Sequence, residues 1–392
     1  MRLAFLSSIV PDGNPTTGFE IANEAILAGL RRGGHEVESF GFAQPRQTVA
    51  DDPSTHVLGR FPLENGSASP LRRVGFVMRA LRSGLPISAG KLTRAAEADV
   101  LRALDAAGPF DALVINSYQM GAAFPQLTRR PFVFVAHNVE HLSALQNADT
   151  AAGRSMRALY RRDARLLKAQ ERRLCRLAHH VFTLSEQDRV ALELTRDKAT
   201  FLPLALPAKP PLNRARRTHD VGLLGTWTWQ PNLVGLEWFV TQVMPRLRGD
   251  ITVAVAGATP SRHPAHKRIE WLGRVPSADR FLAQVGASAL VSRGGTGVQL
   301  KTVEAFTRAL ACVATSASVR GVDTLPANCA LADDPDDFAR SLERTVDAVR
   351  AGEAKVDPAV FATAQQRAMD GALARGMGLA FGDVQASSTS SL

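Results

Sequence analysis

The chain has 392 residues, enough for two ordinary domains, and its 45% hydrophobic and 21% charged residues are typical of a folded globular protein. Its formal net charge of +10 favours an anionic partner, and its three scattered cysteines, without a CxxC or zinc-ligand spacing, argue against a disulfide framework or a zinc site. No apolar stretch approaches the ~18 residues that span a bilayer, and the apolar run at 1–10 is too short for a signal peptide. We therefore expect a cytoplasmic protein that is soluble or sits on a membrane without crossing it.

Near-continuous apolar runs alternate with helical patterns along the first half of the chain. We predict strands at 2–8, 35–42, 111–117, 131–138 and 179–185. Such runs are typical of parallel strands that are covered on both faces, and the strand–helix–strand order indicates a doubly wound sheet.

Residues 43–90 interrupt this rhythm without a clear strand, and we interpret them as a basic insertion. Within it, residues 71–82 have a helical pattern in which arginines surround one apolar face. That face is formed by Val74, Val77, Met78 and Leu81.

The same alternation returns in the second half, with strands predicted at 219–227, 251–258, 269–275, 288–295 and 311–318. A proline-rich, basic stretch separates the two series and reads as a linker. We expect a first lobe at 1–203, a linker at 204–217, a second lobe at 218–375 and a tail at 376–392. The fold class is α/β: two Rossmann-like, doubly wound parallel-sheet lobes that face a cleft, with ligands beyond the carboxyl ends of the strands.

In chain order, the first polar groups at such strand ends lie in the first lobe. Asp12 and Glu20 are loop carboxylates of unknown orientation, for which helix capping is favoured over catalysis. His137 follows a buried strand, where a polar side chain is costly unless it binds something. Glu140, three residues later, is a candidate general base for an incoming hydroxyl, and a structural role for it stays open.

A glycine-rich turn follows the predicted strand at 288–295. Gly294, Gly295 and Gly297 precede a helix, and backbone N–H groups at such a turn, together with the helix dipole, bind anions. Lys301 lies one turn inside the helix and adds a full charge against a diphosphate. Glu304 lies on a similar face, where its carboxylate can accept hydrogen bonds from ribose hydroxyls. The alternative is a tight turn with an exposed lysine and glutamate, but this spacing favours the anion site.

The segment 291–306 resembles the donor-binding segment of GT-B glycosyltransferases of the family-4-like group (glycosyl transferases group 1). In that group two glutamates stand eight positions apart; here the second is Glu304, whereas the first position holds Thr296. The Gly-x-x-x-Lys-x-x-Glu pattern of Gly297, Lys301 and Glu304 resembles a branch of the group in which the lysine holds the donor phosphates.

Other segments of the second lobe share the resemblance. Residues 225–240 resemble the first strand–loop–helix of the donor lobe but carry no basic residue for the phosphates, which places more weight on Lys301. Trp227 and Trp229 line the cleft or pack in the core, and Asn232 is expected to cap the helix. The resemblance implies that the donor-binding residues are Gly18, Gly225, Arg274, Gly295, Thr296, Gly297, Val298, Lys301 and Glu304.

The first lobe resembles the acceptor lobe of the same group, with a glycine-containing loop at 11–20. The resemblance implies acceptor-side roles for Asp12, Thr17 and Glu20, and contact between a histidine at the position of His137 and the transferred sugar. With these roles the catalytic residues are His137, Glu140 and Lys301.

Two strongly basic helices, at 71–82 and 154–176, suggest docking on an anionic lipid surface, with a solvated basic face as the alternative. The protein would then lie on the inner face of the plasma membrane. A nucleic-acid partner is disfavoured, because aromatic residues make up only 6% of the chain and no binding motif interleaves with the basic residues.

We therefore expect transfer of a hexose or similar sugar from a UDP- or GDP-type donor to a hydroxyl acceptor, such as a lipid-linked saccharide, in cell-surface polysaccharide or glycolipid synthesis. Neither a cofactor nor a metal is expected, and retention versus inversion stays open. The alternatives are a nucleotide-sugar epimerase of the same fold and a catalytically silent partner subunit, which Thr296 alone supports. A dinucleotide oxidoreductase is disfavoured because no GxGxxG follows the first strand.

Overall fold

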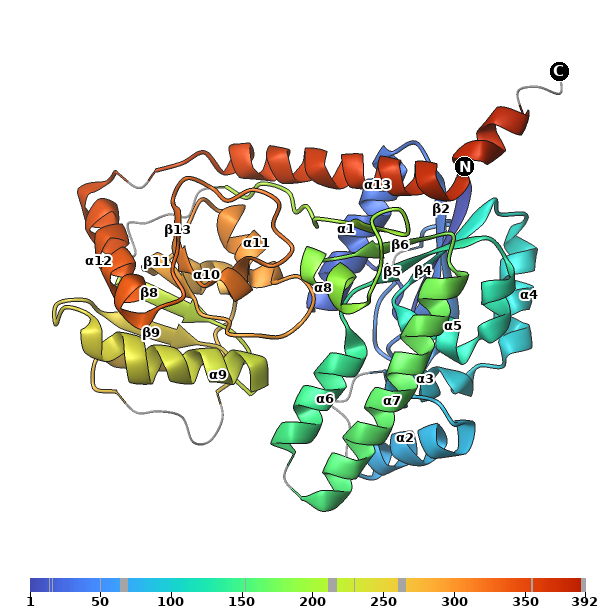
Figure 1. The fold of residues 1–392 in the computed structure, drawn as a ribbon, viewed down its shortest axis with the longest axis horizontal. Coiled ribbons are helices and arrows are strands. Elements are labelled where there is room, and N and C mark those ends of the chain that lie inside the picture. The colour runs from blue at the N-terminus through green and yellow to red at the C-terminus, as the bar shows by residue number, and fades with distance from the viewer. Residues whose placement is uncertain are drawn as a thin grey trace. The chain divides into compact units, whose positions relative to one another are not determined.

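The structure is a computed structural model that describes the chain apart from residues 14, 16, 50, 64–69, 152, 211–216, 229, 260–265, 354 and 389–392. The chain divides into two compact units. Unit 1 comprises Met1–Pro203 and Met369–Leu392, and unit 2 comprises Leu204–Ala368. Each unit contains one sheet, and all strand pairs in both sheets are parallel (Figure 1).

The sheet of unit 1 has the strand order β3-β2-β1-β4-β5-β6-β7 in the described residues. The order reverses beside β1, which pairs with β2 on one side and with β4 on the other. This is the doubly wound arrangement predicted for the first half, and the prediction is confirmed. The strands are β1 (Arg2–Ser7), β2 (Glu36–Ala43), β3 (Thr55–Arg60), β4 (Ala112–Asn116), β5 (Phe132–Ala136), β6 (His180–Thr183) and β7 (Ala199–Phe201).

Helices cover both faces of this sheet, as its continuous apolar strands require. One buried cluster joins Ala4 and Leu6 of β1 to side chains of α4, α5 and α7, so these helices cover one face. The second half of α13 packs on α1 and β6. The helices of unit 1 are α1 (Gly18–Arg32), α2 (Pro70–Ser83), α3 (Ile87–Gly90), α4 (Glu97–Ala107), α5 (Tyr118–Ala123), α6 (Glu140–Thr150), α7 (Arg154–Leu177) and α8 (Glu186–Ala191), with α13 (Pro358–Ser388) entering from unit 2.

The insertion at 43–90 differs from its sequence interpretation in two ways. It contains a strand, β3, which is the half-exposed edge of the sheet and therefore lacks the continuous apolar run of an inner strand. In α2 the buried side chains are Phe76 and Ala80, and Gly90 of α3 packs against Ala80. The predicted apolar face is instead largely exposed: Val74 by 60%, Met78 by 52% and Leu81 by 47%.

The sheet of unit 2 has the order β10-β9-β8-β11-β12-β13 in the described residues. It repeats the reversal seen in unit 1, here between β8 and β11, and confirms the second predicted doubly wound sheet. The strands are β8 (His219–Leu224), β9 (Val253–Ala256), β10 (Ile269–Gly273), β11 (Val285–Leu290), β12 (Ala311–Ala314) and β13 (Cys329–Leu331).

Two layers of helices enclose the second sheet. The helices α9 (Gln230–Trp238) and α12 (Pro335–Ala351) share one buried cluster with alternate residues of the strands. The helices α10 (Ala278–Leu282) and α11 (Leu300–Phe306), with Phe361 of α13, share the other cluster. Trp227 is fully buried in the first cluster and donates from Nε1 to the Ala256 carbonyl at 2.9 Å, so it packs in the core; Trp229 lies outside the described residues.

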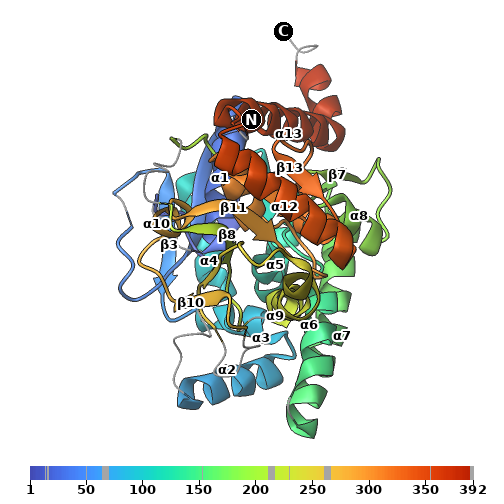
Figure 2. The same cartoon turned by 90° about the vertical axis from the view of Figure 1, so that its left-hand side faces the viewer.

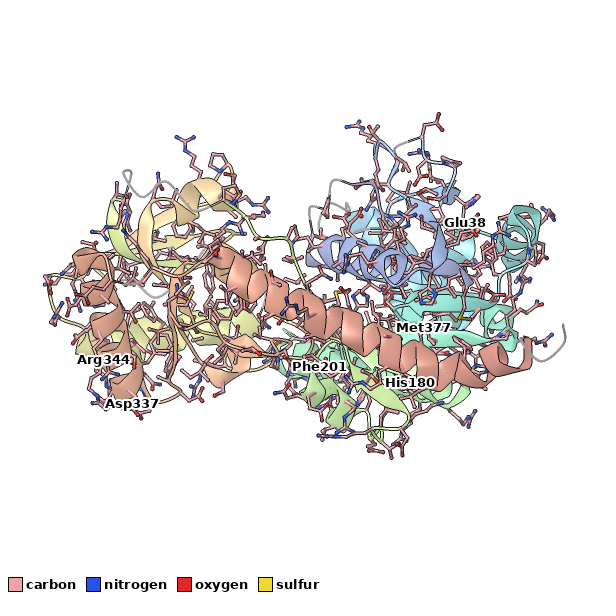
Figure 3. The ribbon with its side chains drawn as sticks, turned by 90° about the horizontal axis from the view of Figure 1, so that it is seen from above. Glu38, His180, Phe201, Asp337, Arg344 and Met377 are labelled. Atoms are coloured by element: carbon pink, nitrogen blue, oxygen red, sulfur yellow. The ribbon has the colours of Figure 1, made fainter. Side chains whose placement is uncertain are left out.

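The last helix, α13, begins in unit 2 and continues into unit 1, so the second lobe ends earlier than predicted. Residues 376–388, expected in a tail, continue this helix. Its close approach explains why: a Cβ on Gly29 of α1 would lie 2.7 Å from Leu373, and a Cβ on Gly376 would lie 2.3 Å from the Phe182 ring of β6. Met377 and His180, labelled in Figure 3, mark this contact between α13 and β6.

Candidate active site

The glycine-rich turn of unit 2 leaves the carboxyl end of β11 and leads into α11. Gly295 and Gly297 have φ angles of 99° and 75°, in the region that side chains other than glycine rarely adopt. Thr296 and Val298, between and after them, are half-buried. The backbone path of the turn therefore depends on glycine at two positions, as expected of a loop that presents its N–H groups to an anion.

Hydrogen bonds fix both ends of this turn. The Ser318 hydroxyl accepts from the Ser292 N–H at 2.8 Å and donates to the Leu290 carbonyl at 2.7 Å. At the other end, the Gln299 N–H donates to the Arg320 carbonyl at 3.2 Å. The turn is thus held in one shape by the loop that follows β12, which is the preorganisation that an anion site needs.

Lys301 is held against unit 2 rather than extended into solvent. Its Nζ donates to Asn232 Oδ1 at 3.1 Å and lies 5.7 Å from the centre of the Trp227 ring. Asn232 in turn donates to the Thr226 carbonyl at 3.1 Å. Asn232 is the third residue of α9, so it is not the helix cap that its position in the sequence suggested. Its amide instead orients the lysine.

A second cation lies beside Lys301. Arg320 is only 6% exposed, and its Nε donates to the Gly297 carbonyl at 3.3 Å. Burial, together with the nearby Arg320 charge, lowers the pKa of Lys301 to about 8. Two cations gathered at a glycine turn repel one another, and a bound phosphate reverses that unfavourable interaction. Arg320 was not among the site residues predicted from the sequence, although its place in the loop after β12 marks the same edge of the sheet.

Glycine is also required where β8 and β9 end. Gly257 has a φ of 116°, and a Cβ there would lie 1.8 Å from the Gly225 carbonyl oxygen. A Cβ on Gly225 would meet the Trp227 ring at 3.1 Å. The predicted donor-site residue Gly225 thus lies in a backbone-to-backbone contact at the carboxyl edge.

The remaining predicted donor-site residues of unit 2 are also placed at this edge. Glu304 is half-buried on α11, and none of the described side chains pairs with its carboxylate. Arg274 is exposed directly after β10. The structure brings together the turn, Lys301 and Arg320, while Arg274 lies at the end of a strand two positions from β8 in the sheet.

At the carboxyl edge of unit 1, a row of buried polar side chains crosses three neighbouring strands. His137 Nε2 is 2.7 Å from Asn116 Oδ1, and Asn116 Nδ2 donates to Asn23 Oδ1 at 2.6 Å. Asn23 Nδ2 donates to the Ser7 hydroxyl at 2.9 Å. Burial lowers the pKa of His137 to about 3, so its imidazole is neutral at physiological pH. Ser117, directly after Asn116, has a φ of 73°, the kind of strained backbone that clusters at functional sites.

A buried carboxylate organises the start of α6. Glu171 of α7 accepts from the Glu140 N–H at 2.6 Å and from His141 Nδ1 at 2.6 Å. It thereby caps a helix whose own N-cap residue, Val139, supplies no side-chain hydrogen bond. Glu171 thus fixes the backbone from which Glu140 projects.

Glu140 itself lies in a setting that disfavours its charge. Burial raises the pKa of its carboxyl to about 7, a hydrogen bond from Asn138 at 3.3 Å opposes this, and the charges of Glu171 and Asp188 add to it. A carboxyl group that titrates near neutral pH can both take up and release a proton there. This property fits the general base that was predicted at Glu140, and the role itself stays a prediction.

The carboxylates of the first loop have local partners. Thr17 and Glu20 form a capping box at the start of α1: the Glu20 N–H donates to Thr17 Oγ1 at 3.3 Å, and Glu20 Oε2 accepts from the Thr17 N–H at 2.8 Å. Asp12 accepts from Gln47 at 2.9 Å. Gly18 is the first residue of α1. The acceptor-side roles of Asp12, Thr17 and Glu20 and the donor-binding role of Gly18 stay predictions.

Among the described residues, no helix combines the length and apolar character needed to cross a bilayer. Within that same part of the chain, no three histidine, cysteine or acidic side chains gather as metal ligands would.

Two Rossmann-like units, each with a doubly wound parallel sheet, define the GT-B architecture. Residues 17–205 match a family model described as glycosyl transferase 4-like domain, and residues 218–348 match one described as glycosyl transferases group 1. The chain therefore belongs to the GT-B glycosyltransferases of the family-4-like group, as the resemblance implied. No curated protein matches the chain in sequence.

Solved structures of the same architecture match along nearly the whole chain. HepE of Anabaena in complex with UDP is 16% identical, with a TM-score of 0.53 over 100% of both chains. The apo form of the lipopolysaccharide outer core galactosyltransferase WaaB is 15% identical, with a TM-score of 0.50 over 98% of this chain and 99% of that one. WaaG, a glycosyltransferase involved in lipopolysaccharide biosynthesis, is 12% identical, with a TM-score of 0.50 over 93% and 98%. At these identities the likeness concerns the fold.

Proposed function

We propose that this glycosyltransferase moves a hexose from a uridine diphosphate donor to a hydroxyl of a saccharide acceptor in the synthesis of a cell-surface polysaccharide or glycolipid. The observation that carries the proposal is the glycine turn of unit 2, where Arg320 donates to the Gly297 carbonyl and lies near Lys301. The complexes of HepE with UDP and with UDP-glucose support the choice of donor.

Catalysis on this proposal consists mainly of stabilising the leaving diphosphate. As the bond between the anomeric carbon and the phosphate oxygen breaks, negative charge grows on that oxygen. Lys301, Arg320 and the N–H groups of the turn are fixed in place before the reaction, so they stabilise this charge without reorganising. Glu304, whose carboxylate has no partner among the described residues, accepts hydrogen bonds from the ribose hydroxyls.

In unit 1, His137 contacts the sugar that is transferred, and Glu140 takes the proton of the acceptor hydroxyl if the product is inverted. The carboxyl of Glu140, with its pKa of about 7, is suited to this step because it is partly ionised at neutral pH and can hold the proton afterwards.

The donor is tested by a thermal-shift screen of uridine, guanosine and adenosine diphosphates and their sugars, followed by a product assay with the best ligand. We expect UDP and a UDP-hexose to raise Tm and the UDP-hexose to release UDP slowly. Lys301→Ala should abolish both effects, whereas Lys267→Ala, which removes an exposed lysine of the same unit, should not. Conversion of the donor sugar without UDP release would instead identify an epimerase. Tight donor binding without turnover would identify a silent subunit.

We also propose that unit 1 docks on an anionic membrane, where a lipid-linked acceptor resides. One exposed face of α7 carries basic side chains at steps of three or four residues, and in the described chain only Arg172 among them pairs with a carboxylate, that of Glu193. The ridge comprises Arg154, Arg157, Arg161, Arg165, Lys168, Arg172 and Arg176.

The exposed apolar side chains of α2 lie close to this ridge. Val74, Met78 and Leu81 share one face of α2, and Arg162 of α7 donates to the Ala80 carbonyl of α2 at 3.0 Å. Both views place α2 and the start of α7 at the same end of unit 1 (Figure 1 and Figure 2). Apolar side chains beside a basic ridge are the combination that binds the interface of an anionic bilayer.

Docking is tested by co-sedimentation with vesicles of phosphatidylglycerol or phosphatidylcholine. We expect the native chain to bind vesicles of phosphatidylglycerol only. This binding should be lost at high salt, in the double variant Arg161→Glu/Arg165→Glu and in Met78→Asp. Val360→Asp alters an apolar residue of α13 that is also exposed, and this variant should bind as the native chain does. Equal sedimentation with both lipids, or unaltered binding by Arg161→Glu/Arg165→Glu, would contradict docking on an anionic membrane through the basic ridge.

A further inference from the structure

The hydrogen bonds along the row of buried polar groups in unit 1 all have a defined donor and acceptor. This is because the row ends at a carbonyl group, which can only accept a hydrogen bond. Asn23 Nδ2 faces the Ile9 carbonyl at 3.4 Å as well as the Ser7 hydroxyl. A carbonyl cannot donate, so the amide nitrogen of Asn23 must lie on that side and its oxygen must face Asn116. The orientation of the first amide is therefore set by the backbone.

The direction passes from Asn23 to Asn116. Because Asn23 presents an oxygen, Asn116 must present its Nδ2, which donates over 2.6 Å. The Oδ1 of Asn116 then faces His137 Nε2 at 2.7 Å and can only accept. The proton of the neutral imidazole consequently lies on Nε2, and Nδ1 is left with a lone pair.

The strands and helix hold this row rigidly. In the register of the sheet, Ser7 pairs with Asn116 and Asn116 with Val135, two residues before His137. Ser7, Asn23 and Asn116 are at most 1% exposed, and the His137 ring also packs on Phe19 at 4.9 Å between centroids. None of the described residues hydrogen-bonds to His137 Nδ1. The imidazole thus has a fixed plane, a fixed tautomer and one uncommitted acceptor.

We infer that Asn116 and Asn23 are positioning residues that lock His137 in the Nε2–H tautomer, so that Nδ1 accepts a hydrogen bond from a sugar hydroxyl. This deepens the proposed function and rests on it for the identity of the ligand. A neutral acceptor attracts a hydroxyl and repels a carboxylate or phosphate oxygen, which offers only lone pairs. The class of sugar it selects is therefore a neutral one with a hydroxyl at this contact, and a uronic acid or deoxy sugar there is disfavoured.

His180 provides an internal contrast. It is also buried, and its pKa is lowered to about 4, but its Nε2 faces the Thr200 hydroxyl at 2.9 Å, which can donate or accept. The Thr200 hydroxyl by itself therefore does not dictate the tautomer of His180, whereas the Asn116 oxygen dictates that of His137.

The tautomers are measured directly by 15N–13C correlation NMR on the histidine-labelled full chain, with His137→Gln to assign the resonance. We expect His137 to show a protonated Nε2 and an unprotonated Nδ1 from pH 5 to pH 8. Asn23→Asp should keep this pattern, because a carboxylate also accepts from Asn116, whereas Asn116→Leu should yield a mixture of tautomers. A protonated Nδ1 in the native chain, or an unchanged pattern in Asn116→Leu, would overturn the inference.

Kinetics separate this role from a purely structural one. Asn116→Leu should lower kcat/KM for the UDP-hexose about tenfold, the loss of one ordinary hydrogen bond, without changing the Kd for UDP. An unchanged kcat/KM would overturn the role in sugar recognition. If the native chain transfers no sugar but shows the Nε2–H tautomer, the proposed function fails while the locking of His137 stands, so the two failures are distinguishable.

Discussion

The two sheets of this protein are both doubly wound, but the side chains at their carboxyl edges differ in charge. At the carboxyl edge of unit 2, glycines and two cations crowd around a turn, and Lys301 has a lowered pKa because it is buried and because its neighbour Arg320 is also positive. At the carboxyl edge of unit 1, neutral amides surround a neutral His137, and Glu140 has a raised pKa because burial and two carboxylates oppose its charge. On the proposed function, one edge suits an anion and the other suits hydroxyl groups and a proton.

This difference shows how a repeated fold divides a reaction. The fold decides where ligands bind, at the ends of parallel strands, and the side chains there decide which ligand it is. Transfer of a sugar from a nucleotide needs both environments: cations for the leaving diphosphate, and uncharged hydrogen-bonding groups with a proton acceptor for the sugar and the incoming hydroxyl.

The largest effect is expected from Gly257→Ala, which tests whether the edge of unit 2 depends on backbone contact. The new Cβ would lie 1.8 Å from the Gly225 carbonyl, and φ is 116°, so we expect a loss of about 3 kcal/mol or more in the free energy of unfolding. Urea denaturation followed by circular dichroism measures it. Gly294→Ala, with nothing within 4 Å, is the control and should be nearly neutral. Equal stabilities would show that the close approach is not needed.

Arg320→Ala sharpens the comparison at the cationic edge. Removing a buried charge-assisted contact should weaken UDP binding by about ten- to a hundredfold, from roughly 1.5–3 kcal/mol. The pKa of Lys301 should rise as its positive neighbour is lost. Arg274→Ala, at an exposed position, should change the Kd for UDP much less. If fluorescence titration shows that Arg274→Ala weakens UDP binding more than Arg320→Ala does, the phosphates do not bind at the turn.

The pH dependence of UDP binding tests the lowered pKa of Lys301 itself. Below pH 8 the lysine is protonated and affinity should be level; above pH 8 UDP must bind the shrinking protonated fraction, so affinity should fall by up to about tenfold per pH unit. Lys301→Arg, which stays protonated, should bind with little change from pH 7 to pH 9. A native chain with no pH dependence in this range would indicate that the lysine does not face the phosphates.

A further prediction concerns Glu140 in unit 1. Between pH 4.5 and 7 the folded chain keeps the Glu140 proton that the unfolded chain releases, so this carboxyl makes the free energy of unfolding fall as pH rises through that window. Glu140→Gln should therefore gain stability over the native chain from pH 5 to pH 8. Glu237→Gln, at an exposed position on α9, should show no such trend in parallel urea denaturations. If the difference in the free energy of unfolding between Glu140→Gln and the native chain is the same at pH 5 and pH 8, the Glu140 carboxyl is exposed to water.

The sequence predicted the inner strands well because their apolar runs have few other interpretations. It did not reveal β3, β7 or β13, which lie at sheet edges and are shorter or more polar. In α2 apolar residues occupy two faces, and periodicity alone could not tell that Phe76 is buried while Met78 is exposed. Only the tertiary fold shows which face finds a partner.

For the candidate site, local spacing was enough to connect Lys301 with the glycine turn. The contributions of Arg320 and Asn116 were missed, because each reaches its partner from a distant part of the chain: 23 residues separate Arg320 from Gly297, and 93 separate Asn116 from Asn23. A polar residue at the carboxyl end of a buried strand, as Asn116 is in β4, is the pattern that could have indicated it. The return of α13 to unit 1 likewise depends on Gly29 and Gly376, whose role is to leave space.

Isothermal titration calorimetry of UDP against the native chain, Lys301→Ala and Lys267→Ala at pH 7 tests the central claim most directly. If unit 2 holds the diphosphate through Lys301, the first variant should bind UDP about ten- to a hundredfold more weakly and the second as tightly as the native chain. Equal affinities for all three proteins would contradict the account, since the diphosphate would then be held elsewhere.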